Sequence, residues 1–98
     1  MNPQHNGQPP LFRLGTVLLT PGALFALVEA QQSALDLLAR HAYGDWGELP
    51  LEDRQANERA LQEGGRLFSG YTLITGRRLW IITEFDRSVT TLLLPMEY

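Results

Sequence analysis

The sequence predicts an α+β fold in which three short N-terminal helices pack on one face of an antiparallel β-meander of three to four strands. Between residues 21 and 63, apolar side chains recur at helical spacing, and helix start and stop signals bound each segment. From residue 67 onward the apolar period changes to two, which is typical of strands. Helices followed by a run of strands indicate an α+β fold, because an α/β fold would alternate the two.

A short strand is expected ahead of the helices. Residues 11–20, LFRLGTVLLT, are rich in leucine and valine, and Gly15 among them is typical of a bulge. Thr20 has the position and type of an N-cap, and Pro21 those of a first helical residue. The first helix is expected to bury one face through its large apolar residues, which are Leu24, Phe25, Leu27 and Val28.

The second and third helices also have recognisable ends. Ser33 opens the second helix with Asp36 three residues later, in the outline of a capping box. Gly44 predicts its end, because glycine is the natural residue of a left-handed C-cap. The third helix, 49–63, is the most polar of the three. We therefore expect it to lie across the outside of the fold.

The C-terminal part of the chain predicts the meander. Residues 67–75, 78–84 and 89–95 have the composition of strands and are separated by short turn segments. Pro95 is expected to end the last strand, because proline cannot donate to a sheet ladder. The N-terminal strand would add a fourth.

Length and composition predict one domain, residues 11–98, behind a flexible leader, residues 1–10, that is polar and rich in proline. The leader lacks the pattern of a secretion signal, and no apolar run approaches the roughly 18 residues of a membrane span. We therefore expect a cytoplasmic protein with no membrane segment. There is no cysteine, and no residue pattern matches a metal or cofactor motif, so neither a metal nor a cofactor is expected.

Charge argues against one class of partner. The formal net charge is −3, whereas non-specific nucleic-acid binding depends on a basic surface, so a nucleic-acid partner is not expected. All eight cations are arginine. We attribute this to a coding bias; the other reading, a need for guanidinium groups that bind carboxylate or phosphate, is not supported by composition alone.

The segment HAYGDWG, residues 41–47, is the first candidate for a site. His41 falls in the last turn of the second helix, where the helix dipole favours a cation, so its pKa is expected to be raised. It would either cap its own helix or serve as a general base or anion contact. Trp46 would either anchor the loop on a core or offer a stacking surface. Asp45 would cap the following turn or hold an arginine.

Three further polar residues are candidates. Asp53 and Asn57 lie four residues apart on an inward helical face, so they must be hydrogen-bonded to nearby backbone or to a ligand. Only a short connection separates this pair from residues 41–47. Arg87 belongs to a charged turn that is either routine turn chemistry or, with the threonines that follow, an anion pocket.

The chain resembles a group of uncharacterised small bacterial proteins found on plasmids, integrative elements and gene cassettes. The resemblance rests on four separated segments that together cover most of the chain: LFRLGTVLLTPGAL, RHAYGDWGEL, NERAL…G…SGYTL and LWIITEFDRSVTTLLLP. It implies a small cytoplasmic accessory protein carried on a mobile genetic element. It implies no catalytic residue.

Two classes of function follow. The first is a non-enzymatic binding or protein-interaction module, expected to be a homo-oligomer with a dimer favoured, because exposed strand edges and a small core both benefit from a partner. Its cleft would lie between the sheet and the third helix and take a small molecule or another protein. The expected lining residues are His41, Asp45, Trp46, Asp53, Asn57 and Arg87, with Tyr71 and Trp80 as apolar walls.

The alternative is a small metal-independent ribonuclease or toxin. His41 would act as general acid or base, and Arg87 would stabilise the charged transition state, with Thr83 or Thr90 positioning phosphate. This reading rests on analogy at the level of fold. It requires His41 and Arg87 to lie within reach of one substrate.

Overall fold

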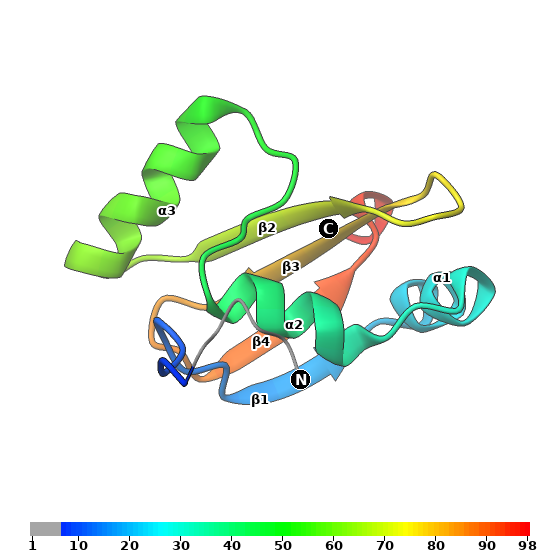
Figure 1. Ribbon diagram of the computed structural model, residues 1–98, viewed down its shortest axis with the longest axis horizontal. Coiled ribbons are helices and arrows are strands. Elements are labelled where there is room, and N and C mark those ends of the chain that lie inside the picture. The colour runs from blue at the N-terminus through cyan, green and yellow to red at the C-terminus, as the bar shows by residue number, and fades with distance from the viewer. Residues whose placement is uncertain (1–6) are drawn as a thin grey trace.

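The computed structural model describes residues 7–98; in chain order the helices follow the first strand and precede the other three, while all four strands lie in one sheet (Figure 1). Of the predicted leader, residues 1–6 lie outside the described range and residues 7–10 are exposed. The elements are β1 (Thr16–Leu19), α1 (Pro21–Ala30), α2 (Ala34–Ala42), α3 (Leu51–Glu63), β2 (Leu67–Thr72), β3 (Arg78–Thr83), β4 (Val89–Leu93) and the 3-10 turn η1 (Pro95–Glu97).

The four strands form one mixed sheet in the order β1-β4-β3-β2. Strands β2, β3 and β4 pair antiparallel in succession, which confirms the predicted three-stranded meander. The fourth strand corrects the prediction, because β1 pairs with β4 in parallel, with Val17 opposite Thr90. Strand composition indicates that a segment is extended, but the direction of its partner depends on the whole connection between them, here all three helices and two strands.

The ends of the first two helices confirm the predicted caps. Thr20 Oγ1 accepts a hydrogen bond from the Ala23 N–H at 3.1 Å, and Pro21 follows at the first helical position. Ser33 Oγ accepts from the Leu35 N–H at 3.1 Å, but among the described residues Asp36 returns no hydrogen bond to Ser33, so the predicted capping box is only half formed. These caps satisfy backbone donors that have no partner inside the helix.

The face that α1 buries differs from the predicted one. Of its four large apolar residues only Leu27 is buried, and the rest of the inward face consists of alanines. Small side chains let a helix backbone approach the sheet closely, so the alanine face packs inward. The larger side chains of Leu24, Phe25 and Val28 are left exposed.

The main core lies between the sheet and helices α1 and α2. Alternate residues of β2, β3 and β4 point to this side, including Tyr71, Ile81 and Leu92. A smaller core cluster, made of Phe12, Trp46, Ala60 and Leu67, lies where α3 meets the start of β2. Helix α3 buries only Asn57 and Ala60, and Figure 1 shows it at the outer edge beyond β2, so α1 and α2 cover the face on which all three helices were predicted to pack.

No helix within residues 7–98 combines the length and the apolarity needed to cross a membrane.

Candidate functional site

The loop that joins α2 to α3, residues 44–48, is fixed along the outer edge of β2. The Gly70 N–H donates to the Trp46 carbonyl at 3.0 Å, and the Glu48 N–H donates to the Gly70 carbonyl at 2.7 Å. Gly47 has a φ of +77°, and a Cβ at that position would lie 2.1 Å from the Gly70 oxygen. Only glycine allows this approach, which turns the loop into a short extra strand that covers the sheet edge.

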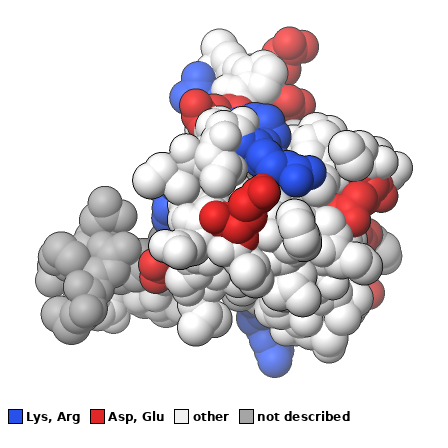
Figure 2. All heavy atoms as spheres, turned by 90° about the vertical axis from the view of Figure 1, so that its right-hand side faces the viewer, with Lys and Arg blue, Asp and Glu red and all other residues white. Residues whose placement is uncertain are grey.

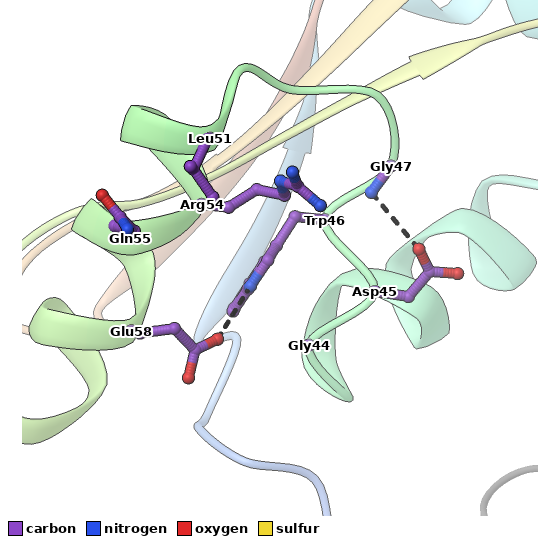
Figure 3. Close-up of a pocket in the computed structure, with 8 residues that line it drawn as sticks. All are labelled: Gly44, Asp45, Trp46, Gly47, Leu51, Arg54, Gln55 and Glu58. Atoms are coloured by element: carbon purple, nitrogen blue, oxygen red, sulfur yellow. Dashed lines mark hydrogen bonds between the residues drawn. The ribbon is translucent and has the colours of Figure 1, made fainter.

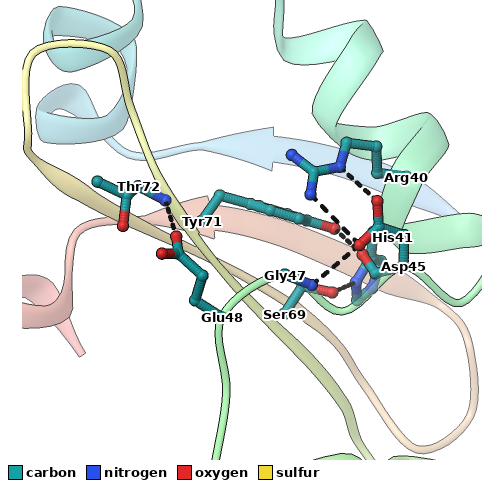
Figure 4. Close-up of polar contacts among 8 residues, drawn as sticks. All are labelled: Arg40, His41, Asp45, Gly47, Glu48, Ser69, Tyr71 and Thr72. Carbon is teal, nitrogen blue, oxygen red and sulfur yellow. Dashed lines mark hydrogen bonds and ion pairs between the residues drawn. The ribbon is translucent and has the colours of Figure 1, made fainter.

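Asp45 fulfils both roles predicted for it. Its carboxylate accepts from Arg40 Nε at 2.6 Å and from the Gly47 N–H at 3.2 Å (Figure 4). The hydrogen bond from Arg40 is the main reason that the pKa of Asp45 lies below its usual value. The Arg40 guanidinium also lies 4.6 Å above the centre of the Tyr71 ring, whose hydroxyl donates to the Asp45 carbonyl at 2.7 Å. Asp45 therefore locks the loop to α2 and β2.

Trp46 is an anchor. Only 4% of its surface is exposed, and its ring stacks on Phe12 with the ring centres 6.2 Å apart. The indole Nε1–H donates to Glu58 Oε2 of α3 at 3.1 Å (Figure 3). A buried indole N–H needs such a partner, and this one connects the loop to the helix across the space between them.

His41 is fully buried, and its pKa corrects the prediction. We expected the helix end to raise this pKa, whereas burial lowers it to about 3. Nδ1 lies 2.5 Å from Ser69 Oγ, and Nε2 lies 2.9 Å from Thr83 Oγ1. The free energy required to remove an imidazolium from water exceeds the stabilisation that the helix dipole gives to a positive charge. The ring is therefore neutral.

His41 begins a chain of hydrogen bonds that runs through Thr83 and Thr90 to the Leu14 carbonyl, and each group in it donates to the next. Thr90 Oγ1 donates to the Leu14 carbonyl at 2.7 Å and lies 2.7 Å from Thr83 Oγ1. A hydroxyl has one proton to donate, so Thr83 donates to Thr90 and must accept from His41 Nε2–H. Counting donors in this way assigns the proton to Nε2 and makes Ser69 the donor to Nδ1.

The Ser69–His41 pair has the spacing of a nucleophile and its base, but it lies inside the core. Both side chains are completely buried, and Phe12 and Trp46 pack edge-on against the imidazole at 5.1 and 5.8 Å between ring centres. A substrate would have to displace these rings to reach the hydroxyl. The arrangement serves to satisfy a polar group in the core.

Among the described residues, the Arg87 guanidinium donates all of its hydrogen bonds to backbone carbonyls. It donates to the carbonyls of Ala60 and Gly65, at 3.1 and 2.5 Å, and so closes the C-terminal end of α3. It also donates to two carbonyls of its own turn, at 3.2 and 3.1 Å. Phe12 lies against both Arg87 and His41, with the guanidinium 5.8 Å from the ring centre. The two residues thus contact one aromatic ring without sharing an open site.

Asn57 and Asp53 face β2 and not the loop at 44–48. The Asn57 side chain donates to the Phe68 carbonyl at 2.7 Å and accepts from the Phe68 N–H at 3.0 Å, in place of a neighbouring strand. Asp53 is half-buried and lines a separate hollow of about 240 Å³ together with Arg66, Phe68, Trp80, Ile82 and Tyr98. The residue of α3 that meets the loop is Glu58.

An open cleft of about 420 Å³ lies between the loop and α3 (Figure 3). It is lined by Gly44, Asp45, Trp46, Gly47, Leu51, Arg54, Gln55 and Glu58. Of the six predicted lining residues only Asp45 and Trp46 are among them. The predicted walls also differ: Tyr71 is buried beneath the loop, and Trp80 belongs to the opposite face of the sheet.

Sequence reasoning did not single out Phe12, Arg54 or Glu58. Arg54 and Glu58 stand four residues apart on a polar helix, where such pairs are common, so their spacing carried no signal for a site. Phe12 precedes the strand and has no motif. Within residues 7–98, no group of three or more His, Cys, Asp or Glu side chains is placed to hold a metal ion.

The six predicted site residues therefore do not form one site, and Asp53 lines the separate hollow on the other face of the sheet. Asp45 and Trp46 border the open cleft, whereas His41, Asn57 and Arg87 are held inside the fold by internal hydrogen bonds. The resemblance to plasmid-related proteins stays a prediction. Comparison with protein-family models, with curated proteins and with solved structures finds no match to this chain.

Proposed function

We propose that this chain is a non-enzymatic binding module whose ligand site is the cleft between the loop 44–48 and α3. One observation carries the proposal. The Arg54 side chain extends from α3 toward the loop across the cleft, and within residues 7–98 its guanidinium has no hydrogen bond or ion pair (Figure 3). A guanidinium beside a preformed hollow is well placed to bind a planar anionic group.

The chemistry of the lining narrows the ligand. The Asp45 carboxylate is paired with Arg40, and Glu58 accepts from the Trp46 indole while keeping its negative charge; Arg54 and the Gln55 amide are the side-chain donors of the lining that have no partner among the described residues. Leu51 adds an apolar contact. This set suits a small carboxylate or an acidic peptide side chain that carries an apolar portion.

The rigidity of the site supports binding. Trp46 is held by Phe12 and Glu58, and the loop backbone is held by β2, so no part of this wall needs to order when a ligand arrives. A preorganised wall lowers the entropic cost of binding.

Within residues 7–98, no contact favours the ribonuclease alternative. Its proposed acid or base, His41, is buried with both ring nitrogens occupied, and the carbonyls around Arg87 leave no anion pocket at that guanidinium. General acid–base catalysis needs a group within reach of a substrate proton.

The biological setting rests on the resemblance stated above. It supports the proposal of a cytoplasmic accessory protein of a mobile genetic element that binds a small molecule or a protein partner. As expected from its strand edges, the module would work as a homo-oligomer.

The test uses the two tryptophans of the chain. A Trp80→Phe variant leaves Trp46 as the single indole, and its N–H signal reports on the cleft in a titration with small carboxylates followed by NMR. We expect binding that shifts the Trp46 indole signal and the amides of residues 44–58. Replacement of Arg54 by glutamine should weaken binding about tenfold or more, because a charge-assisted hydrogen bond is lost.

The matched control is Arg59→Gln, which removes an exposed arginine of the same helix outside the cleft. It should leave binding unchanged. Shifts confined to another surface, or equal affinity for the Arg54 variant and its parent, would contradict the proposed site.

A further inference from the structure

Helix α1 turns large apolar side chains toward solvent. Leu24, Phe25 and Val28 are 55%, 65% and 67% exposed, and they lie on one side of the helix, while its alanines and Leu27 face the core. A surface helix ordinarily places polar residues on its outer face. A helix that is apolar on both sides is typical of one that is covered on both sides.

Strand β1 lies beside this helix and has an open edge. The N–H groups of Thr16 and Thr20 donate to the carbonyls of Ser88 and Leu92 at 2.9 and 3.0 Å. Backbone groups alternate along a strand, so those of Val17 and Leu19 face away from β4. The side chains of Val17, Leu18 and Leu19 are also exposed, which is unusual for three successive apolar residues.

The two edge strands of the sheet, β2 and β1, differ in whether their outward backbone groups have hydrogen-bond partners. At the β2 edge, the loop 44–48 and the Asn57 amide supply hydrogen-bond partners. At the β1 edge, the described part of the chain supplies no corresponding cover. Proteins ordinarily protect an edge strand with charge, proline or a covering segment, and an unprotected apolar edge pairs with another chain.

The segment that forms β1 and α1 carries no charge of its own, although the Glu97 carboxylate accepts hydrogen bonds from Thr20 Oγ1 and the Gly22 N–H where the strand passes into the helix. Residues 14–28 contain no charged side chain, and Arg13 and Glu29 stand at the two ends of the stretch. The helix follows the strand after one residue and packs against it. Figure 2, which looks at the side of the molecule where α1 lies, shows wide uncharged areas around a few central charged side chains. A surface with so few charges repels a second copy of itself only weakly, and it lacks the basic patch that a nucleic acid needs.

We propose that this surface is a homodimer interface, in which β1 pairs antiparallel with β1 of a second copy. A two-fold axis between identical strands requires them to run in opposite directions, so the pairing joins two four-stranded sheets into one. The outward apolar residues of α1 are buried by the same contact. Six large apolar residues, each at least 36% exposed, would be covered by this contact together with the open strand edge.

The first test is sedimentation of the full chain together with two interface variants. We expect a species of twice the 11.0 kDa chain mass for the wild type. Phe25→Glu places a charge on the outer face of α1, and Val17→Pro removes an N–H that faces away from β4, so both should sediment as folded monomers. Ile74→Glu is the matched control, since Ile74 is more exposed than Phe25 but lies in the β2–β3 hairpin, and this variant should remain dimeric.

Hydrogen exchange provides a second test that needs no substitution. The amides of Val17 and Leu19 should exchange at least tenfold more slowly at high protein concentration than at low concentration, whereas the Ile74 amide should not respond. A wild type that stays monomeric at high concentration would overturn the proposal. So would a dimer that survives both interface substitutions, because its contact would then lie elsewhere.

Discussion

At the scale of single residues, Asp45 and His41 differ in where their hydrogen-bond partners come from. Asp45 holds Arg40 and caps Gly47, all within a few positions, and both readings of Asp45 followed from the loop itself. The pKa of His41 could not be predicted, because its environment comes from Ser69 and Thr83 on two distant strands. Desolvation is a tertiary property, and helix position alone gave the opposite sign.

The buried His41 makes stability depend on pH. An unfolded histidine has a pKa of about 6.5, and burial lowers the folded value to about 3, so between these values the unfolded chain binds a proton that the folded chain does not. The stabilising effect is therefore complete above pH 6.5 and decreases as the pH falls, by up to about 1.4 kcal/mol per pH unit. Urea denaturation at about pH 7.5 and about pH 5 measures this slope, above the range in which most carboxylates titrate.

A His5→Gln variant is the control for this slope, because it leaves His41 as the single histidine. The same pH dependence is expected in this variant, and the His41 ring signals should not titrate near pH 6.5. An imidazole that titrates at its ordinary pKa in the folded protein would show that the ring is accessible to water.

At the scale of elements, the caps at Thr20 and Ser33 were predictable because each lies within three residues of the N–H that it accepts. The direction of β1 was not predictable, because its partner β4 lies some seventy residues away. The inward face of α1 was misjudged for a related reason. Ala26 and Phe25 both suit a buried position, and only the close approach of the sheet decides that the alanine faces inward.

The attachment of the loop 44–48 to β2 depends on the glycine at position 47. Gly47→Ala would force a side chain into the left-handed region and bring its Cβ against the Gly70 oxygen. We expect a loss of about 3 kcal/mol or more in the free energy of unfolding, because the loop must leave the β2 edge. Urea denaturation measures the loss, and the Trp46 indole signal reports the displaced loop.

Gly76→Ala separates the two causes of that loss. Gly76 also has a positive φ, of +93°, but no atom lies within 4 Å of its added Cβ. Its replacement should cost only the backbone strain, about 1–2 kcal/mol. Equal losses for the two variants would mean that the contact between Gly47 and Gly70 contributes nothing.

At the scale of the whole molecule, the α+β class and the meander were predictable from periodicity, whereas the cleft was not. Its two walls come from a loop and a helix that the sequence placed correctly, but the residues that face each other, Trp46 and Glu58, are set by how α3 lies on β2. Asn57 was expected in the cleft and instead completes the strand edge. Asn57 and Glu58 are adjacent, so a rotation of the helix by about 100° is enough to exchange these roles.

The open β1 edge has a consequence for the stability of the whole molecule. If folding and dimer formation are linked, the melting temperature of the wild type should rise with protein concentration, because association stabilises the folded state by mass action. For a domain of this size, we expect an increase on the order of a few degrees for each tenfold rise in concentration. Differential scanning calorimetry over a hundredfold concentration range, about the widest that is practical, measures the increase.

The Phe25→Glu and Ile74→Glu variants make this prediction specific to one surface. Ile74→Glu should keep the concentration dependence, since Ile74 lies outside the surface of β1 and α1. Phe25→Glu should lose it and melt at the temperature that the wild type approaches on dilution, because Phe25 is largely exposed in a single chain and its replacement costs little there. A Phe25→Glu variant that retains the full dependence on concentration would place the association on another face. A wild type whose melting temperature is constant would mean that the exposed residues of α1 and β1 stay in contact with water.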